Sequence, residues 1–83
     1  MLQTKEQIKL AAKLLKLPIE KVREYGSVIK DTDLFYLSEP VKGGRSLIVG
    51  QDGTVLFANS SIDYDRHIEE FNNGRRTPIE DFV

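Results

Sequence analysis

Apolar positions near the start of the chain recur every three or four residues, which is the spacing of one helix face. Thr4 and Gln7 have the spacing of a capping box, and strong helix formers follow from Lys5 to Lys16. The apolar arc spans about 200°, against the ~100° stripe of an ordinary surface helix, so the sequence predicts cover on more than one side. The arc consists of Ile8, Leu10, Ala11, Ala12, Leu14, Leu15 and Leu17.

A proline separates this first helix from a second one. The residue before Pro18 is pushed out of the α region, and Pro18 itself suits the first position of a helix. We predict the second helix over Ile19–Tyr25, with Gly26 as its left-handed cap. Ile19 and Val22 are expected on its inner face, covering the first helix.

The middle of the chain changes to β-type patterning. We predict a first strand over Leu34–Leu37. A short extended piece before it is a candidate at Val28–Ile29. Two apolar runs between Ser46 and Ala58 then flank Asp52-Gly53, a strong hairpin signal. We expect both turn residues to take positive φ in a type I′ turn. Apolar residues on both faces of these runs predict central strands covered by helices.

The last part of the chain returns to a helical period. Ser60 or Ser61 is the predicted cap of a third helix over Ile62–Asn72, which Asn73-Gly74 ends. Its expected apolar face consists of Tyr64, Ile68 and Phe71.

A short tail follows the third helix. Thr77 and Glu80 repeat the capping-box spacing around Pro78, which predicts one more helical turn with Ile79 and Phe82 tucked onto the body. The sequence therefore predicts a single α+β domain over residues 1–83. Its expected order is α-α-β-β-β-α, with a three-stranded antiparallel meander packed by helices.

Composition narrows the classes of protein. The chain has 83 residues, 40% of them hydrophobic, and no cysteine, which excludes disulfides, zinc–cysteine sites and thiol nucleophiles. We predict a cytoplasmic protein, because a small secreted domain usually needs cross-links and the first residues lack a signal-peptide core. About 18 consecutive apolar residues are needed to span a membrane, and no such run occurs.

Charge is unevenly distributed around a net value of −1. Residues 1–25 carry six basic and three acidic side chains, whereas residues 59–83 carry three basic and six acidic ones. The overall balance argues against nonspecific nucleic-acid binding as the main role.

His67 is the only histidine, with Asp63 and Glu70 as helix neighbours. This set lacks a third convergent ligand and a nucleophile, so we interpret His67 as a structural residue at the margin of the apolar face. The sequence predicts no catalytic residues, no metal site and no cofactor. An enzyme is the least favoured class.

The outer face of the third helix is the candidate partner surface. With Asp65 and the tail residues Glu80 and Asp81, it could form an acidic surface that steers a basic protein; a solvated helix face is the simpler interpretation. The residues predicted on this face are Asp63, Arg66, Glu69, Glu70 and Asn73.

Two basic clusters are weaker candidates. Arg75-Arg76 could bind an anion or an acidic partner, but cations after a helix also satisfy its last carbonyls. The lysine stripe of the first helix could contact nucleic acid, although a solvated face is the commoner explanation. The stripe consists of Lys5, Lys9, Lys13 and Lys16.

The run from Gly43 to Phe57, the pair Ser60-Ser61 and the segment from His67 to Phe71 resemble small α+β immunity proteins of bacterial polymorphic toxin systems. The resemblance covers about residues 34–74. It implies a helix before a meander with a central hairpin, and a later helix packed across the sheet. It also implies stoichiometric binding of a cognate toxin, without chemistry. Tyr36 and Tyr64 would be aromatic anchors of that binding surface.

Two other classes remain as alternatives. The wide apolar arc of the first helix could mark a homo-oligomeric or adaptor domain. A nucleic-acid-binding regulator is less favoured, because Lys21 and Arg23 of the second helix are diluted by Glu20 and Glu24.

Overall fold

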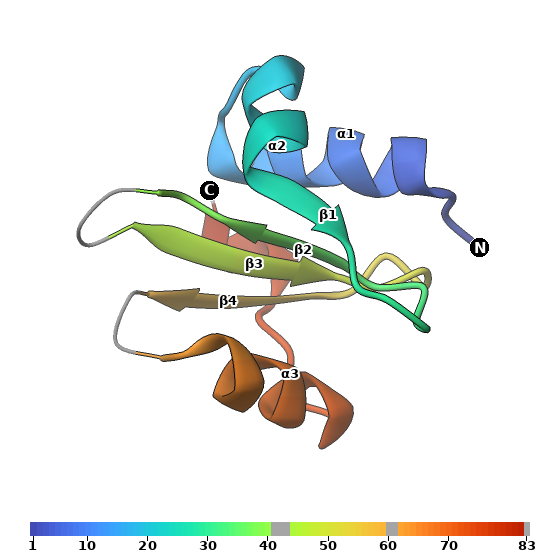
Figure 1. Ribbon diagram of the computed structural model, residues 1–83, viewed down its shortest axis with the longest axis vertical. Helices are drawn as coiled ribbons and strands as arrows, with labels where there is room; N and C mark the ends of the chain where they lie inside the picture. The colour runs from blue at the N-terminus through green and yellow to red at the C-terminus, as the bar shows by residue number, and fades with distance from the viewer. Residues whose placement is uncertain (41–43, 60–61, 83) are drawn as a thin grey trace.

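The computed structural model describes residues 1–40, 44–59 and 62–82. Two helices, α1 (Thr4–Leu15) and α2 (Ile19–Tyr25), lie on one face of a sheet, and α3 (Tyr64–Asn72) lies on the other (Figure 1). A 3₁₀ turn, η1 (Ile79–Phe82), follows. The protein is therefore an α+β fold in three layers. No helix within the described ranges is long and apolar enough to cross a membrane.

The sheet has four antiparallel strands in the order β1-β2-β3-β4, so the predicted three-stranded meander is wrong by one strand. The additional strand ends at Val28, where the candidate extended piece Val28–Ile29 was expected, but it begins two residues earlier. It begins at Gly26, whose φ of −123° is extended and not left-handed. A Cβ at this position would overlap the Phe35 ring, which explains why glycine is needed in an extended segment. The strands are β1 (Gly26–Val28), β2 (Phe35–Ser38), β3 (Arg45–Val49) and β4 (Val55–Asn59).

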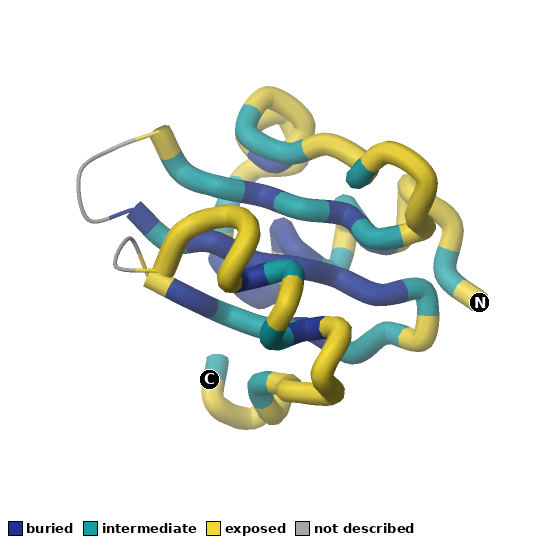
Figure 2. Tube along the Cα trace, turned by 60° about the horizontal axis from the view of Figure 1, so that its bottom comes forward, coloured by how far each residue is buried: buried dark blue, intermediate teal, exposed yellow. Residues whose placement is uncertain are grey.

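The register divides the strand residues between two buried faces. Phe35 pairs with Val49, and Val49 pairs with Val55, so these three side chains share the face under α1. Side chains alternate along a strand, so the intervening residues, such as Ile48, face the side of the sheet on which α3 lies. Figure 2 shows a run of buried positions along β3. Ile48 and Val49 are both fully buried, which confirms that β3 is a central strand covered on both sides. The same prediction is wrong for β4, which is an edge strand of the sheet.

Helix α1 closes the larger core. Its apolar residues are all buried or half-buried by α2, the sheet and η1, which confirms the predicted cover on several sides. The predicted capping box is wrong by one residue. The cap is Gln3, whose N–H donates to the Glu6 carboxylate at 3.0 Å. Gln7 is instead buried, and its Nε2 donates to the backbone oxygens of Asp33 (2.7 Å) and Val49 (3.0 Å).

Helix α2 has the predicted bounds. Pro18, which the sequence places at the first helical position, is instead the N-cap. Val22 is fully buried against α1 as expected. Ile19 is expected on the same inner face, but this is wrong, since the side chain is 39% exposed.

The Asp52-Gly53 turn joins β3 and β4 as predicted, but its type differs. Only Gly53 has positive φ (83°). The Gly53 N–H donates to the Gly50 oxygen, and the Gly50 N–H donates to the Thr54 oxygen, a pattern typical of a three-residue loop with a left-handed third residue. Asp52 keeps negative φ, and its carboxylate accepts from Thr54 Oγ1 at 2.6 Å.

Helix α3 begins two residues later than predicted. Its N-cap is Asp63, whose carboxylate accepts the Arg66 N–H at 2.8 Å. The predicted caps, Ser60 and Ser61, lie outside the described residues. Gly74 follows the helix with φ of 93°, which confirms the predicted termination.

The tail both extends the sheet and returns to α1. Thr77 does not cap a helix, because its N–H donates to the Val55 oxygen and its Oγ1 accepts the Phe57 N–H. Phe82 then packs edge-on against Phe57, with ring centroids 5.9 Å apart. Ile79, which was expected against the body, is 44% exposed.

Candidate protein-binding surface around α3

The two tyrosines predicted as anchors lie together. Tyr64 opens α3, and Tyr36 points from β2 toward the same side of the sheet, because its neighbours Phe35 and Leu37 face α1. Their rings meet edge-on with centroids 4.8 Å apart. Tyr64 is 45% exposed and Tyr36 is half-buried, so the pair reaches the surface. We call Tyr36 and Tyr64 the tyrosine surface.

Small polar residues adjoin the tyrosine surface on the sheet. Ser27 of β1 pairs with Tyr36 and is exposed, and Ser38 lies two residues along β2 on the same face. Helix α3 packs mainly on β3 and β4, at the other end of the sheet. The face over β1 and β2 therefore presents aromatic and hydroxyl groups next to the helix.

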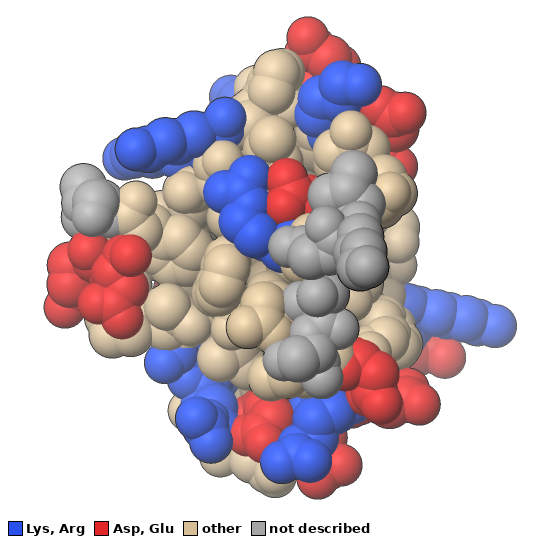
Figure 3. Space-filling model, turned by 90° about the vertical axis from the view of Figure 1, so that its left-hand side faces the viewer, with Lys and Arg blue, Asp and Glu red and all other residues tan. Residues whose placement is uncertain are grey.

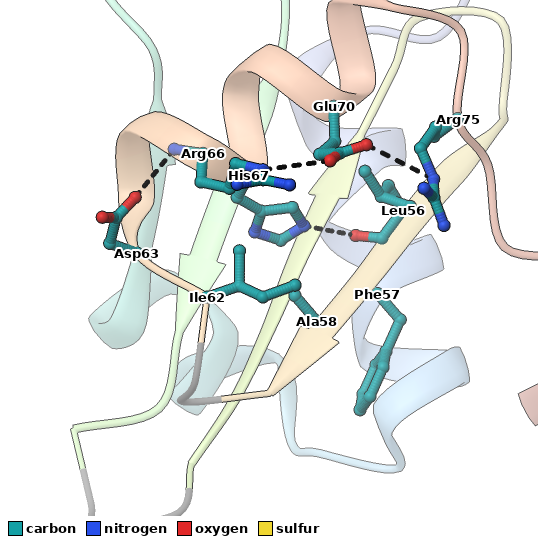
Figure 4. A pocket seen from close by; sticks show the side chains of 9 residues that line it. All are labelled: Leu56, Phe57, Ala58, Ile62, Asp63, Arg66, His67, Glu70 and Arg75. Carbon is teal, nitrogen blue, oxygen red and sulfur yellow. Dashed lines mark hydrogen bonds and ion pairs between the residues drawn. The ribbon is translucent and has the colours of Figure 1, made fainter.

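The opposite side of α3 borders a pocket along β4 (Figure 4). It has a volume of about 480 Å³, with apolar walls from the strand and charged side chains from the helix. Three of the predicted site residues, Asp63, Arg66 and Glu70, lie here and not beside the tyrosines. The full lining is Leu56, Phe57, Ala58, Ile62, Asp63, Arg66, His67, Glu70 and Arg75.

The charges of this side largely neutralise one another. Glu70 accepts from Arg66 Nε at 3.0 Å and lies 3.4 Å from Arg75 Nε. Asp63 is occupied as the helix cap. Basic and acidic groups accordingly alternate near the bottom of the molecule in Figure 3. Asp65 and Glu69 form no ion pair with any described residue, so they are the acidic groups left unpaired.

The acidic surface predicted from α3 and the tail does not assemble. Glu80 and Asp81 belong to η1, which packs against α1 on the other side of the sheet (Figure 1). Sequence proximity suggested one surface, but the chain crosses the edge of β4 between the two segments. Residues 62–76 alone carry four acidic and three basic side chains, a net charge of only −1.

His67 is fully buried between α3 and the sheet. Its Nε2 lies 2.9 Å from the Leu56 oxygen, and its ring meets the Tyr36 ring at a centroid distance of 5.7 Å. Burial lowers the pKa of the imidazole below its ordinary value of 6.5, partly opposed by the hydrogen bond with Leu56. The interpretation of His67 as a structural residue fits this position.

The two arginines after α3 have different roles. Arg76 Nη1 donates to the Phe71 oxygen at 2.8 Å, and its guanidinium lies 3.5 Å from the centre of the Phe71 ring. Arg76 thus satisfies a carbonyl at the end of α3, as the sequence analysis considered for cations after a helix. Arg75 instead pairs with Glu70 at the pocket, a contact that the sequence analysis did not predict.

The lysine stripe of α1 lies on the far side of the sheet from the tyrosine surface. All four lysines are exposed. On α2, Lys21 pairs with Glu24 at 3.4 Å, which reduces the basic character of that helix. The stripe is thus a second, separate charged surface.

Among the described residues, no three histidine, aspartate or glutamate side chains are grouped to hold a metal ion. Comparison of the chain with protein-family models, curated proteins and solved structures finds no match. The resemblance to immunity proteins therefore stays a prediction.

Proposed function

We propose that this chain is a non-catalytic protein-binding domain that presents the tyrosine surface to a partner protein. The contact of half-buried Tyr36 with exposed Tyr64 carries the proposal. Tyrosine is enriched among residues that dominate binding energy, because it offers a large rigid area and a polar end. Adjacent serines supply adaptable hydrogen bonding, as in other tyrosine-rich binding surfaces.

Charge favours a partner with basic groups near the contact. Asp65 directly follows Tyr64 on α3, and Glu69 lies about one turn further along the helix. Both are exposed and form no ion pair with a described residue. Charges at the rim of an interface mainly raise the association rate and select the partner. The tyrosines would then provide the affinity, and these carboxylates the steering.

A toxin-neutralising role is the specific form of this proposal. An immunity-like protein acts by stoichiometric cover of another protein, which requires a fixed surface and no catalytic groups. The proposal includes the cytoplasmic location predicted from the absence of cysteine. The homo-oligomeric alternative was based on the wide apolar arc of α1. No apolar residue of α1 is fully exposed, so this arc does not support that alternative.

The test is quantitative affinity capture with the wild-type chain and the Tyr64→Ala variant. We expect a protein recovered in equimolar amounts by the wild type and at least about tenfold less by Tyr64→Ala, the loss expected for a central aromatic anchor. A toxin partner should also lose its activity when the wild-type chain is added.

A matched control places substitutions on the other side of the sheet. Lys9→Gln with Lys13→Gln changes the lysine stripe and should leave capture unchanged. The proposal would be contradicted if Tyr64→Ala captured as much partner protein as the wild type, or if only the lysine variant lost capture. If the wild type captured nucleic acid and the lysine variant did not, the regulator alternative would be supported instead.

A further inference from the structure

A continuous series of ring contacts connects a buried imidazole to the tyrosine surface. His67 is fully buried and meets Tyr36, with ring centroids 5.7 Å apart. Tyr36 in turn meets the exposed Tyr64 at 4.8 Å. His67 also joins α3 to β4 through Leu56. The His67 ring therefore lies where α3, β4 and the tyrosine surface meet.

The hydrogen bonds define which proton His67 holds. Because Nε2 faces the Leu56 carbonyl oxygen, we assign the proton of the neutral ring to Nε2, which leaves Nδ1 with a free lone pair. Nδ1 is buried and has no hydrogen-bond partner among the described residues. A second proton would place an N–H donor and a positive charge where neither is satisfied, which is strongly unfavourable.

The charged groups around His67 are already engaged. On α3, Asp63 caps the helix, and Glu70 pairs with Arg66 and Arg75. From the sheet, Tyr36 is the ionisable residue that packs on the ring. The other strand residues on this face do not ionise near neutral pH; they are Ser38, Ser46, Ile48, Leu56 and Ala58.

We propose that His67 is a proton-sensitive switch for the tyrosine surface, in which protonation releases α3 from the sheet and separates Tyr64 from Tyr36. This regulation rests on the proposed function, because it matters only if the tyrosines bind a partner. The direction follows from the pKa, which is lowered in the folded state. Docking of α3 keeps its full stability above about pH 6.5 and weakens as the pH falls from there toward the lowered folded pKa.

The test uses the chain alone, followed by NMR from about pH 7.5 to about pH 5, the range in which histidine titrates. His67 is the only histidine, so its Cε1 proton is identified directly. We expect a midpoint below 6.5, with the ring signals of Tyr36 and Tyr64 changing at the same midpoint. Exchange of the α3 amides, corrected for its intrinsic pH dependence, should be faster below the folded pKa of His67 than at pH 7.5. The expected acceleration is about tenfold for each unit by which folding lowers this pKa. Amides of α1 should not follow.

Two variants complete the test. His67→Gln keeps a side-chain N–H for Leu56 and cannot gain a proton in this range, so the tyrosine transition should disappear. Lys9→His adds an exposed imidazole on the opposite side of the sheet and should titrate near 6.5 without moving the tyrosine signals.

Two outcomes would overturn the switch. One is titration of His67 with unchanged tyrosine signals, and the other is a tyrosine transition that persists in His67→Gln. If His67→Gln does not fold, coincidence of the wild-type midpoints still decides. Since no partner is present, these results can be interpreted whatever the capture experiment shows.

Discussion

At the scale of single residues, some polar side chains make different contacts in the fold from those that the local sequence pattern predicts. Thr4 and Gln7 fit a capping box, yet the cap forms one residue earlier with Gln3 and Glu6. The Gln7 amide is instead needed inside, where it satisfies two carbonyl oxygens from the β1–β2 loop and the end of β3. Buried carbonyl groups require such partners, so this contact outweighs the helix cap.

Replacing the Gln7 amide should therefore be costly. Gln7→Met keeps the length of the side chain but removes both N–H donors, so we expect unfolding free energy to fall by about 2 kcal/mol. Urea denaturation followed by circular dichroism measures the change. Lys9→Met, on the exposed side of α1, is the matched control and should change stability by no more than about 0.5 kcal/mol. Equal effects of the two variants would show that the buried amide does not stabilise the fold.

At the scale of elements, α3 depends on its first residue as much as on its apolar face. The helix has nine residues, too short to be stable by itself, so it relies on its cap and on packing. Asp63 satisfies a free backbone N–H at its start, and His67 and Phe71 are buried against the sheet. The candidate tyrosine surface is consequently only as well ordered as the docking of this helix.

Loss of the cap should be distinguishable from loss of negative charge. We expect Asp63→Ala to lower the unfolding free energy by about 1 kcal/mol, because the cap acceptor disappears. Asp63→Asn keeps an acceptor and should retain most of this stability. Asp65→Ala, also at the start of α3 but without a cap bond, should cost only about 0.3 kcal/mol through the helix dipole. Thermal or urea unfolding of the three variants tests this order, and a larger loss in Asp65→Ala would contradict it.

At the scale of the whole molecule, the tail connects the two helical layers. After α3, the chain pairs with the edge of β4 through Thr77 and then reaches the α1 side, where Phe82 meets Phe57. This path separates the acidic residues of η1 from those of α3. It also covers part of an exposed sheet edge, which otherwise invites association with other strands.

Removing the tail should destabilise the fold beyond the contacts of η1 itself. A chain that ends at Arg76 loses the Phe82 packing and two hydrogen bonds to β4, so we expect about 2–4 kcal/mol less unfolding free energy. Denaturant unfolding gives the value, and sedimentation reports any association through the uncovered edge. Ile79→Ala, at an exposed position of η1, is the control and should be nearly neutral. An unchanged transition in the truncated chain would show that the tail merely rests on the surface.

The sequence by itself determined the elements whose signals are local. Helix periodicity located α1 and α3, Pro18 located the start of α2, and the Asp52-Gly53 pair located the β3–β4 hairpin, because these preferences depend on residues a few positions apart. Gly26 shows the limit of such signals: it matches a helix cap, but contact with Phe35, nine positions later, makes it the start of a strand. The candidate site depended equally on distant contacts. Tyrosine pairing and burial of His67 both arise where α3 meets the sheet, so only the tertiary structure could decide them.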